Sequence, residues 1–339
     1  MNKIYLLILL SLFLNCGTNN HLSESNKIVE TTGEIALNFA NTITENDLKT
    51  YLYIIASDEF EGRETGEPGQ KKAAEYLKNF YQKNNISAPL GDNNYFQEIP
   101  TEHLKPNLNP SENVLSFIEG TEKPEEILVI SAHYDHLGME NGEIYNGADD
   151  DGSGTVAIME IAQAFKKASE NGNGPKRSIL FLHVTGEEKG LLGSKYYTNY
   201  PIFPLAKTVA NLNIDMIGRV DDAHENNPNF VYLIGSDKLS TELHEISEEM
   251  NEKFTNLKLD YTYNDDNDPN RFYYRSDHYN FAKNNIPIIF YFNGTHQDYH
   301  EPSDTPDKIN YELLAKRTKL IFYTAWEIAN RQERIKVDK

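Results

Sequence analysis

The feature that most constrains the fold is a regular alternation of short apolar runs with amphipathic stretches, which begins at residue 127. The apolar runs have the length of buried strands and cover residues 127–132, 178–185, 208–214 and 286–292. Helical periodicity marks residues 155–167 and about 310–331. Buried strands that alternate with helices predict an α/β fold, with a mixed, largely parallel central sheet flanked by helices.

The composition limits the size of the fold and the kind of partner. The chain has 339 residues, of which 39% are hydrophobic and 25% are charged, as in an ordinary globular protein with a substantial core. Its net charge of −20 argues against nucleic acid as a partner, because binding to phosphates requires an excess of Lys and Arg. The acidity is interpreted as a solvated surface.

The N-terminus has the pattern of an export signal. Lys3 precedes an apolar run over residues 4–14, which is shorter than the roughly 20 residues that a membrane-spanning helix needs. Cys16, the one cysteine of the sequence, follows this run. We expect a lipoprotein signal peptide over residues 1–16 and a mature chain that is lipidated at Cys16, although the residues before it are not the small ones usual there. A plain secretory signal with an incidental cysteine is the alternative.

Both interpretations export the protein, and the lipoprotein interpretation places it in the cell envelope, facing the periplasm or the exterior. A lipid at Cys16 would be its only attachment to a membrane. Residues 17–26 are polar and are expected to form a tether, and residues 27–335 are expected to form a single domain. Within it, residues 46–84 show helical periodicity interrupted by a loop at 61–69 that is rich in Gly and charge.

Side chains that bind metals follow the predicted strands. His133 comes directly after the first strand, Glu187 and Glu188 follow the second, and Asp215 follows the third. In open α/β sheets the carboxyl ends of the strands form one edge, at which ligands bind. We therefore expect these side chains to converge on one site.

The order of the candidate ligands describes a two-metal hydrolase. Two divalent ions about 3.5–4 Å apart need one bridging carboxylate, one His and one further carboxylate for each ion, and a separate base for the water between them. The sequence supplies these in the order His133, Asp150, Glu188, Asp215 and His300. Glu187 is an extra carboxylate directly before the third of them.

Each motif also has a simpler interpretation. A histidine after an apolar strand is more often a hydrogen-bonded core residue than a ligand, and His136 is interpreted as one. For His133 the carboxylate of Asp135 could accept the proton of the second ring nitrogen and so fix the tautomer. The acids around Asp150 could be a helix cap and turn, and a calcium loop is less suitable because the acids are consecutive. A bound dication would offset their mutual repulsion.

The tandem acids Glu187 and Glu188 lie between a strand and a glycine-rich turn. Adjacent acids in a turn are usually solvated. They also suit a division of roles in which one coordinates a metal and the other acts as general base.

Taken together, five motifs in fixed succession resemble the secreted zinc aminopeptidases of bacteria, whose wider relatives include glutamate carboxypeptidase, the transferrin receptor ectodomain and glutaminyl cyclase. The resemblance covers about residues 48–329. The motifs are Ala-His133-Tyr-Asp135, Gly147-Ala-Asp-Asp150-Asp-Gly-Ser-Gly154, Gly186-Glu187-Glu188-x-Gly-Leu-Leu-Gly-Ser194, Leu212-Asn-Ile-Asp215-Met-Ile-Gly218 and Asp298-Tyr299-His300-x-Pro-x-Asp-Thr305.

The resemblance implies a zinc exopeptidase-like three-layer sandwich that holds two Zn²⁺ and hydrolyses peptides with a free N-terminus. It implies that His133 and Asp215 hold one zinc ion, Glu188 and His300 the other, and that Asp150 bridges them. The resemblance implies three further roles. Glu187 is the general base, Asp135 is the hydrogen-bond partner of His133, and Tyr299 donates a hydrogen bond to the developing oxyanion. It also implies a cis peptide bond between Asp150 and Asp151.

Three other functions occur among these relatives. A glutaminyl cyclase is a transferase that uses one zinc ion, and the complete set of five ligands argues against it. A binding module without catalysis would be expected to have lost ligands or Glu187. A carboxypeptidase that releases glutamate would differ by pocket residues; Arg275, Asp277, Phe290 and Phe292 are candidates for that pocket, although core packing is the simpler interpretation of the two phenylalanines.

Overall fold

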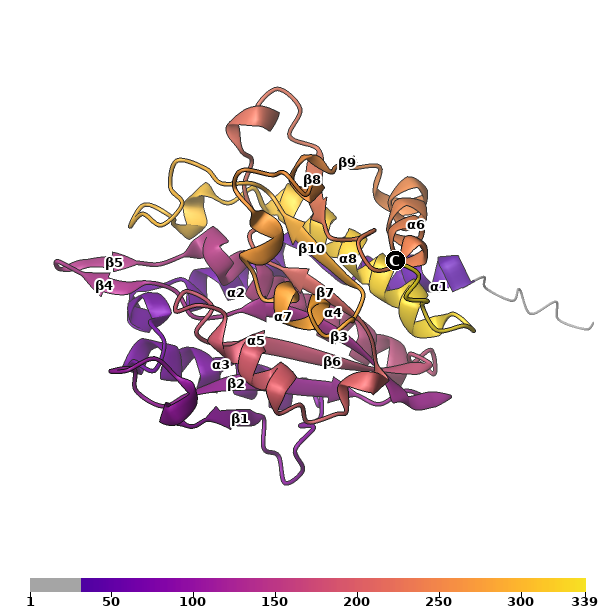
Figure 1. The fold of residues 1–339 in the computed structure, drawn as a ribbon, viewed down its shortest axis with the longest axis horizontal. Coiled ribbons are helices and arrows are strands. Elements are labelled where there is room, and N and C mark those ends of the chain that lie inside the picture. The colour runs from indigo at the N-terminus through magenta and orange to yellow at the C-terminus, as the bar shows by residue number, and fades with distance from the viewer. Residues whose placement is uncertain (1–31) are drawn as a thin grey trace, which may run out of the picture. The chain divides into compact units, whose positions relative to one another are not determined.

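The computed structural model describes residues 32–339 (Figure 1). The predicted signal peptide, Cys16 and the polar tether lie outside the described residues and stay predictions. Among the helices of the described range, none combines the length and the apolar character that crossing a membrane requires.

The centre of the fold is an eight-stranded mixed sheet with the strand order β1-β2-β6-β3-β7-β10-β8-β9. The strands are β1 (Phe96–Ile99), β2 (Ser111–Ile118), β3 (Lys123–His133), β6 (Arg177–Val184), β7 (Thr208–Ile214), β8 (Phe230–Ile234), β9 (Lys258–Asp260) and β10 (Ile288–Phe292). The four central strands β6, β3, β7 and β10 are parallel, whereas β2 and β8 join them antiparallel on either side. The predicted mixed, largely parallel sheet is confirmed.

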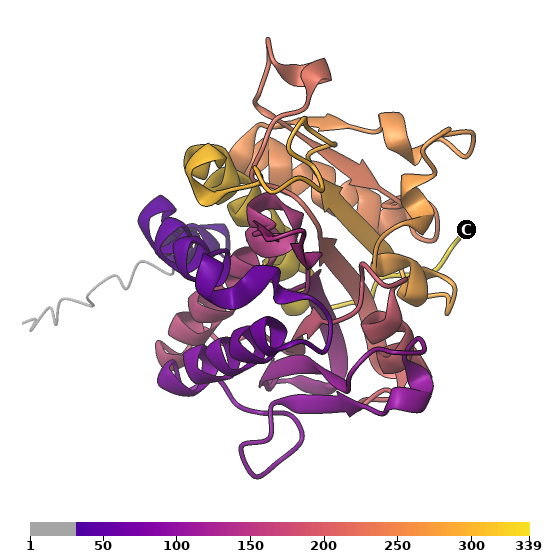
Figure 2. The same cartoon turned by 90° about the vertical axis from the view of Figure 1, so that its left-hand side faces the viewer.

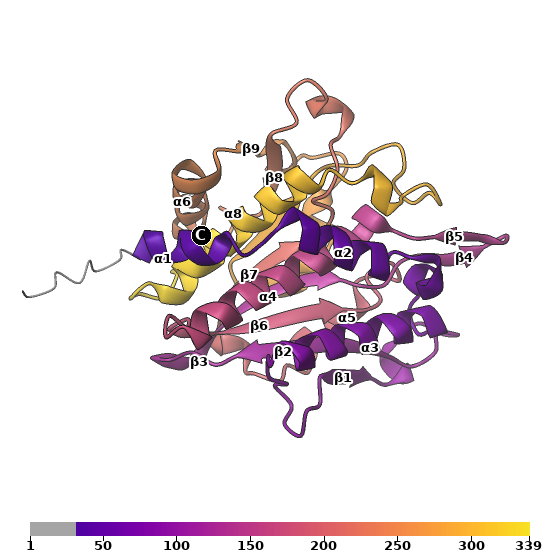
Figure 3. The same ribbon diagram turned by 180° about the vertical axis from the view of Figure 1, so that it is seen from behind.

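Helices cover both faces of this sheet, unequally. Six of them pack on one face, where their buried side chains form one apolar core with the sheet: α1 (Thr32–Ala40), α2 (Glu45–Ile55), α3 (Pro68–Lys83), α4 (Gly154–Glu170), α6 (Thr241–Met250) and α8 (Tyr311–Asn330) (Figures 1 and 3). The opposite face is covered by α5 (Leu192–Asn199) and α7 (His278–Ala282), which contribute Tyr197 and Phe281 to a second core. Figure 2 shows the helices near the N-terminus together on one side of the twisted sheet.

Strand β3 shows why the central strands are continuous apolar runs. Leu128 and Ile130 belong to the core under the six helices, and Ile127 and Val129 belong to the core under α5 and α7. All four are at most 1% exposed. Successive side chains of a strand point to opposite faces, so a strand that is covered on both faces favours apolar residues at successive positions.

The elements that surround the site agree closely with the sequence pattern. The predicted strand 208–214 is β7, the predicted helix 155–167 lies within α4, and the last predicted helix is α8. Asn310 caps α8, because its side chain accepts the backbone N–H of Leu313 at 3.0 Å. A small hairpin of β4 (Gly138–Glu140) and β5 (Glu143–Tyr145) forms a separate two-stranded sheet.

Candidate metal centre

The candidate ligands meet at the carboxyl ends of the central strands. His133 is the last residue of β3, and Asp215 directly follows its neighbour β7. Glu187 and Glu188 lie in the turn between β6, the other neighbour of β3, and α5. Asp150 comes from the turn before α4, and His300 from the loop after β10. Parallel strands in register thus bring together residues that are far apart in the sequence.

The first group of donor atoms lies around His133. Its Nε2 atom is 3.2 Å from Asp150 Oδ1 and 3.6 Å from Asp215 Oδ1. Its Nδ1 atom is 3.0 Å from the backbone carbonyl oxygen of Asp135. A carbonyl oxygen can only accept, so this contact places a proton on Nδ1 and leaves Nε2 as the ring nitrogen that faces the carboxylates.

The contact between His133 and Asp135 differs in detail from the expected one. The carboxylate of Asp135 lies 3.8 Å from His133 Nδ1, and the backbone carbonyl takes its place as the acceptor. The Asp135 carboxylate instead accepts the hydroxyl of Thr65 at 2.7 Å and the backbone N–H of Glu187 at 3.2 Å. It therefore ties the turn that carries Glu187 to the end of β3.

The second group of donor atoms lies around His300. Its Nε2 atom is 3.0 Å from Asp150 Oδ2 and 3.5 Å from Glu188 Oε2. The two oxygens of Asp150 thus face two different histidines, His133 and His300. A carboxylate placed in this way has the geometry of a bridge between two metal positions.

The interpretation of His136 as a hydrogen-bonded core residue needs correction. The side chain is buried, but within residues 32–339 neither of its ring nitrogens has a hydrogen-bond partner. Its Nδ1 atom lies 3.0 Å from Glu188 Oε1 and 3.8 Å from Asp150 Oδ2, which makes it part of the second donor group. The signal was its position three residues after His133, on the turn by which the chain leaves the site.

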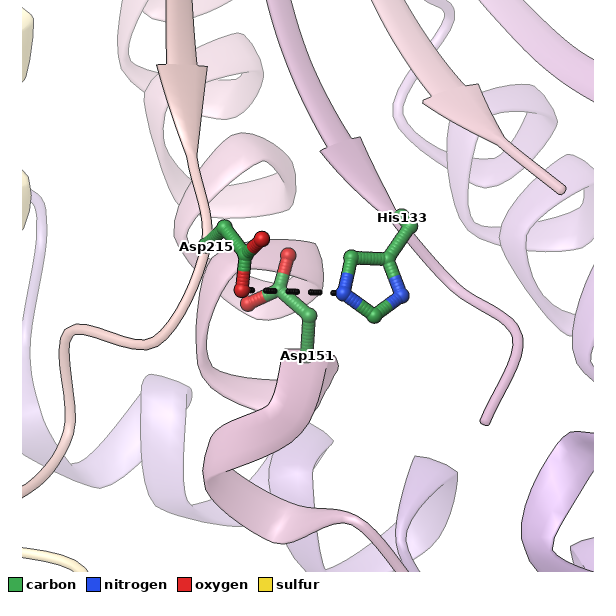
Figure 4. Close-up of side chains that lie close together, drawn as sticks. All are labelled: His133, Asp151 and Asp215. Atoms are coloured by element: carbon green, nitrogen blue, oxygen red, sulfur yellow. Dashed lines mark ion pairs between the residues drawn. The ribbon is translucent and has the colours of Figure 1, made fainter. Parts of the chain in front are cut away.

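Asp151 is a second residue that the sequence analysis did not assign to the site. Figure 4 shows its carboxylate between His133 and Asp215, and all three residues offer donor atoms within 4.8 Å of one another. One carboxylate oxygen accepts the backbone N–H groups of Gly154 at 2.9 Å and Met216 at 3.0 Å. Asp151 therefore fastens the start of α4 to the end of β7. The peptide bond between Asp150 and Asp151 is cis, as the resemblance implies.

Buried charged groups hold the turn that carries Asp150. The Asp304 carboxylate accepts the backbone N–H groups of Asp149 at 3.0 Å and Asp150 at 3.1 Å. From the other side, the fully buried Arg63 donates to the carbonyl oxygens of Tyr134, Asn146 and Gly147. Nothing in the local sequence around Arg63 signals this role, because these three acceptors lie more than 70 residues away.

The adjacent acids Glu187 and Glu188 have opposite electrostatic surroundings. Burial raises the pKa of Glu187 well above its usual value, and the charges of Glu188 and Asp215 raise it further. Against burial, His136 and His300 hold the pKa of Glu188 down to about 2. Two neighbouring acids whose pKa values are pushed apart are typical of a site in which one is a base and the other a permanent anion.

The histidines of the site show the complementary shift. Burial alone would lower the pKa of His133, but Asp215 and Asp150 raise it well above its ordinary value. Asp150 and Glu188 likewise outweigh burial and raise the pKa of His300 to about 10. The imidazoles and carboxylates therefore stabilise one another's charged forms.

The donor set fits two zinc ions. Imidazole nitrogens and carboxylate oxygens are zinc ligands, and Asp150 connects a His133–Asp215 group with a Glu188–His300 group. In the described part of the chain, the buried atoms Glu188 Oε1 and His136 Nδ1 lie 3.0 Å apart without a hydrogen bond of regular geometry, so two ligand-type atoms face each other in the second donor group.

A small cavity that is partly open to solvent lies beside these residues. Asp150, Glu187 and Asp215 form one part of its wall, and the rest includes Phe272, Arg275, Phe290, Phe292 and Tyr299. The ring of Tyr299 stacks on His300 with 3.9 Å between their centres. Phe290 and Phe292 are thus core residues that also line the cavity, whereas Asp277 is buried elsewhere and accepts the hydroxyl of Ser194 at 2.5 Å.

The chain resembles known peptidases in sequence and in fold. The chain is 32% identical over 215 residues to a probable leucine aminopeptidase of the fungus Trichophyton verrucosum, an alignment that covers 61% of this chain and 55% of the relative. The chain thus spans about half the length of this curated relative. The curated relatives that match by sequence include fungal and plant proteins, so the resemblance to secreted bacterial enzymes in particular is not confirmed and secretion stays a prediction.

Two solved structures share the fold. The LapA aminopeptidase of Legionella pneumophila superposes with a TM-score of 0.69 at 23% identity, covering 90% of this chain and 77% of that one. BSAP, a zinc aminopeptidase from Bacillus subtilis, gives a TM-score of 0.64 at 16% identity over 86% of this chain and 97% of that one. The sequence model of peptidase family M28 matches residues 113–325, which include all the candidate ligands, and the chain therefore belongs to this family.

Proposed function

We propose that this chain is a two-zinc aminopeptidase. The observation that carries the proposal is the position of Asp150, whose two oxygens lie 3.2 Å from His133 Nε2 and 3.0 Å from His300 Nε2. In the proposed arrangement His133 and Asp215 hold one zinc ion, Glu188 and His300 hold the other, and Asp150 bridges them. When bound, the two ions would supply Lewis acidity that lowers the pKa of a water molecule and polarises a peptide carbonyl.

Glu187 is the proposed general base. It lines the cavity beside Asp150 and Asp215, and its raised pKa suits a group that takes up a proton and releases it. It takes a proton from the attacking water and returns it to the nitrogen of the leaving amine. The hydrogen bond from its backbone N–H to Asp135 fixes the turn from which it acts.

Tyr299 is the proposed donor to the carbonyl oxygen of the substrate. Burial raises the pKa of its phenol, and the charges of Asp150 and Asp215 raise it further. The phenol therefore keeps its proton at neutral pH and can donate it to an oxygen on which negative charge develops.

The same site suits an exopeptidase that requires a free N-terminus. The substrate's α-ammonium group is a cation, and the cavity wall of Asp150, Glu187 and Asp215 is rich in carboxylates. An acylated N-terminus carries no charge there, and its acyl group would occupy the space that the amine needs.

The test is hydrolysis of an aminoacyl 4-nitroanilide and of its N-acetyl derivative, with chelator and with zinc added back. We expect cleavage of the free substrate that chelator abolishes and zinc restores, and a kcat/KM at least roughly a hundredfold lower for the acetylated form, on the scale of losing a buried hydrogen bond to a charge. Equal rates on both substrates would exclude an aminopeptidase. Release of C-terminal glutamate from blocked peptides would favour the carboxypeptidase, and cyclisation of N-terminal Gln without cleavage would favour the cyclase.

A further inference from the structure

The cavity beside the candidate metal centre has an arginine in its wall, and the proposed function gives it no role. Arg275 follows the short 3-10 turn Phe272–Tyr274 and lines the same cavity as the candidate ligands Asp150 and Asp215. Its side chain is exposed. Its contacts distinguish a residue that can bind a ligand from an ordinary surface arginine.

Arg275 is held in place without an anionic partner. Its guanidinium carbon lies 4.8 Å from the centre of the Phe272 ring, and Nη2 donates to the Tyr299 hydroxyl at a long 3.4 Å. Among the described residues, the arginines that form ion pairs with carboxylates are Arg177, Arg219 and Arg331. The aromatic ring covers one face of the Arg275 guanidinium, and most of its five N–H donors stay available to a ligand.

The wall of the cavity that Arg275 shares with the candidate ligands is amphipathic. It contains the carboxylates of Asp150, Glu187 and Asp215, the guanidinium of Arg275, and the apolar side chains of Phe290 and Phe292, which are almost completely buried. A ligand that matches this wall has an ammonium group, a short apolar segment and a carboxylate. An N-terminal glutamate or aspartate residue has all three.

We propose that Arg275 binds a carboxylate of the substrate and makes the site selective for peptides with an acidic N-terminal residue. This inference rests on the proposed aminopeptidase function and names its substrate class. Arginine suits the role because its planar fork of donors matches both oxygens of a carboxylate. The free α-carboxylate of a dipeptide offers the same chemistry. We favour the side chain because Arg275 and the carboxylates that would receive the α-ammonium line one cavity.

The experiment compares kcat/KM for the 4-nitroanilides of Glu and Gln, which have the same shape and differ in charge. We expect the wild-type protein to prefer Glu, and Arg275→Gln to lower the Glu/Gln ratio by roughly 10- to 100-fold, the scale of losing one hydrogen bond to a charged group. Arg275→Glu should shift the preference toward Lys. The matched control is Arg271→Gln, because Arg271 lies in the same loop, stacks on Tyr274 at 4.8 Å and does not line this cavity.

A second arm compares the dipeptide Ala-Gly with Ala-Gly-amide. A loss of preference for the free dipeptide in Arg275→Gln, with an unchanged Glu/Gln ratio, would support carboxylate binding and assign it to the C-terminal group. Equal losses on all substrates would overturn the inference, because Arg275 would then act only through Tyr299. A wild-type protein that cleaves none of these substrates would overturn the proposed function as well, so the two failures are distinguishable.

Discussion

The two donor groups that share Asp150 are built differently. The His133 group comes from the ends of strands. His133 is the last residue of β3, Asp215 directly follows β7, and the His133 side chain is 1% exposed. The His300 group comes from loops. The His300 side chain is 37% exposed, and the backbone of this residue has a φ of +60°. Strands are held by a ladder of hydrogen bonds on both sides, whereas a loop is held only by the contacts that it makes. The sheet therefore fixes the positions of the His133 group, whereas the positions of the His300 group depend on contacts made by loops.

The largest expected effect separates Glu187 from Glu188. Glu187→Gln should keep both zinc ions and lower kcat by roughly 10²–10⁴-fold, because the base is lost and the ligands are kept. Glu188→Gln should lose the zinc ion of the His300 group, here called the loop-side group, and keep the zinc ion of the His133 group, here called the strand-side group. Zinc content and kcat measured on the same preparations check this. Equal zinc loss in both variants would refute the assigned roles.

A smaller effect tests the comparison itself. If the loop-side group binds zinc more weakly, a limiting amount of chelator should remove one zinc ion first, and activity should fall in that first phase. His300→Ala should remove this early phase and leave the late one, whereas His133→Ala should affect the late phase. The expected difference in affinity is roughly 10- to 100-fold, on the scale of losing supporting contacts. Loss of both ions in a single phase in all three proteins would contradict the comparison.

Asp304 offers a test of the residue that the two groups share. Asp304→Asn keeps the size of the side chain but weakens two hydrogen bonds to the backbone N–H groups of Asp149 and Asp150. We expect both zinc affinities to fall together, by roughly tenfold, because the bridging carboxylate is displaced relative to both histidines. Zinc titration followed by calorimetry measures the two steps. A change at only one of them would show that Asp304 supports one half of the centre.

The smallest effect concerns the pH dependence of stability away from the centre. Burial raises the pKa of Glu160, on α4, to about 7, and the charge of Asp47 adds to this. The folded state then holds this proton more tightly than the unfolded state, so stability falls as pH rises from about 4.5 to 7. Glu160→Gln has no proton to lose and should be more stable than the wild type at pH 8, by about 1–2 kcal/mol, with little difference at pH 4.

Urea unfolding at both pH values measures the effect of Glu160→Gln. The replacement keeps an oxygen that can accept the backbone N–H of Thr44, which Glu160 Oε2 now accepts at 3.2 Å. Glu170→Gln on the exposed end of the same helix is the matched control and should change neither value. A pH dependence that persists unchanged in Glu160→Gln would assign it to the metal centre instead.

The part of the fold that the sequence predicts is the part with uniform burial. Strands β3 and β6 contain the continuous apolar runs 127–130 and 179–182, and β7 was predicted although Asn211 and Asn213 are buried in it. The candidate ligands follow closely after the ends of these three strands. Strand β2 was not predicted, because Ser111, Asn113 and Ser116 interrupt its apolar pattern although all three are buried. The Asn113 side chain donates to Gly193 and accepts from Thr185. Such long-range pairing makes a buried polar strand stable and leaves no local signal.

The candidate site also contains residues that the sequence predicts and residues that it does not. Residues at strand ends could be placed from the sequence, since the parallel order of the strands determines where they meet. The positions of His136 and Asp151 depend on how two turns fold back into the site, which the pattern of apolar residues does not encode. The carbonyl partner of His133 was missed for a similar reason, because every residue has a carbonyl and only the backbone path selects one.

Arg63 also determines where this protein can be cut. The family match begins at residue 113, whereas the guanidinium that holds the carbonyl groups of Tyr134, Asn146 and Gly147 comes from residue 63. A shortened chain that starts at residue 113 would contain every candidate ligand and would still lose the group that holds the turn of Asp150. The smallest autonomous unit of this chain must therefore extend at least fifty residues upstream of the segment that the family model matches.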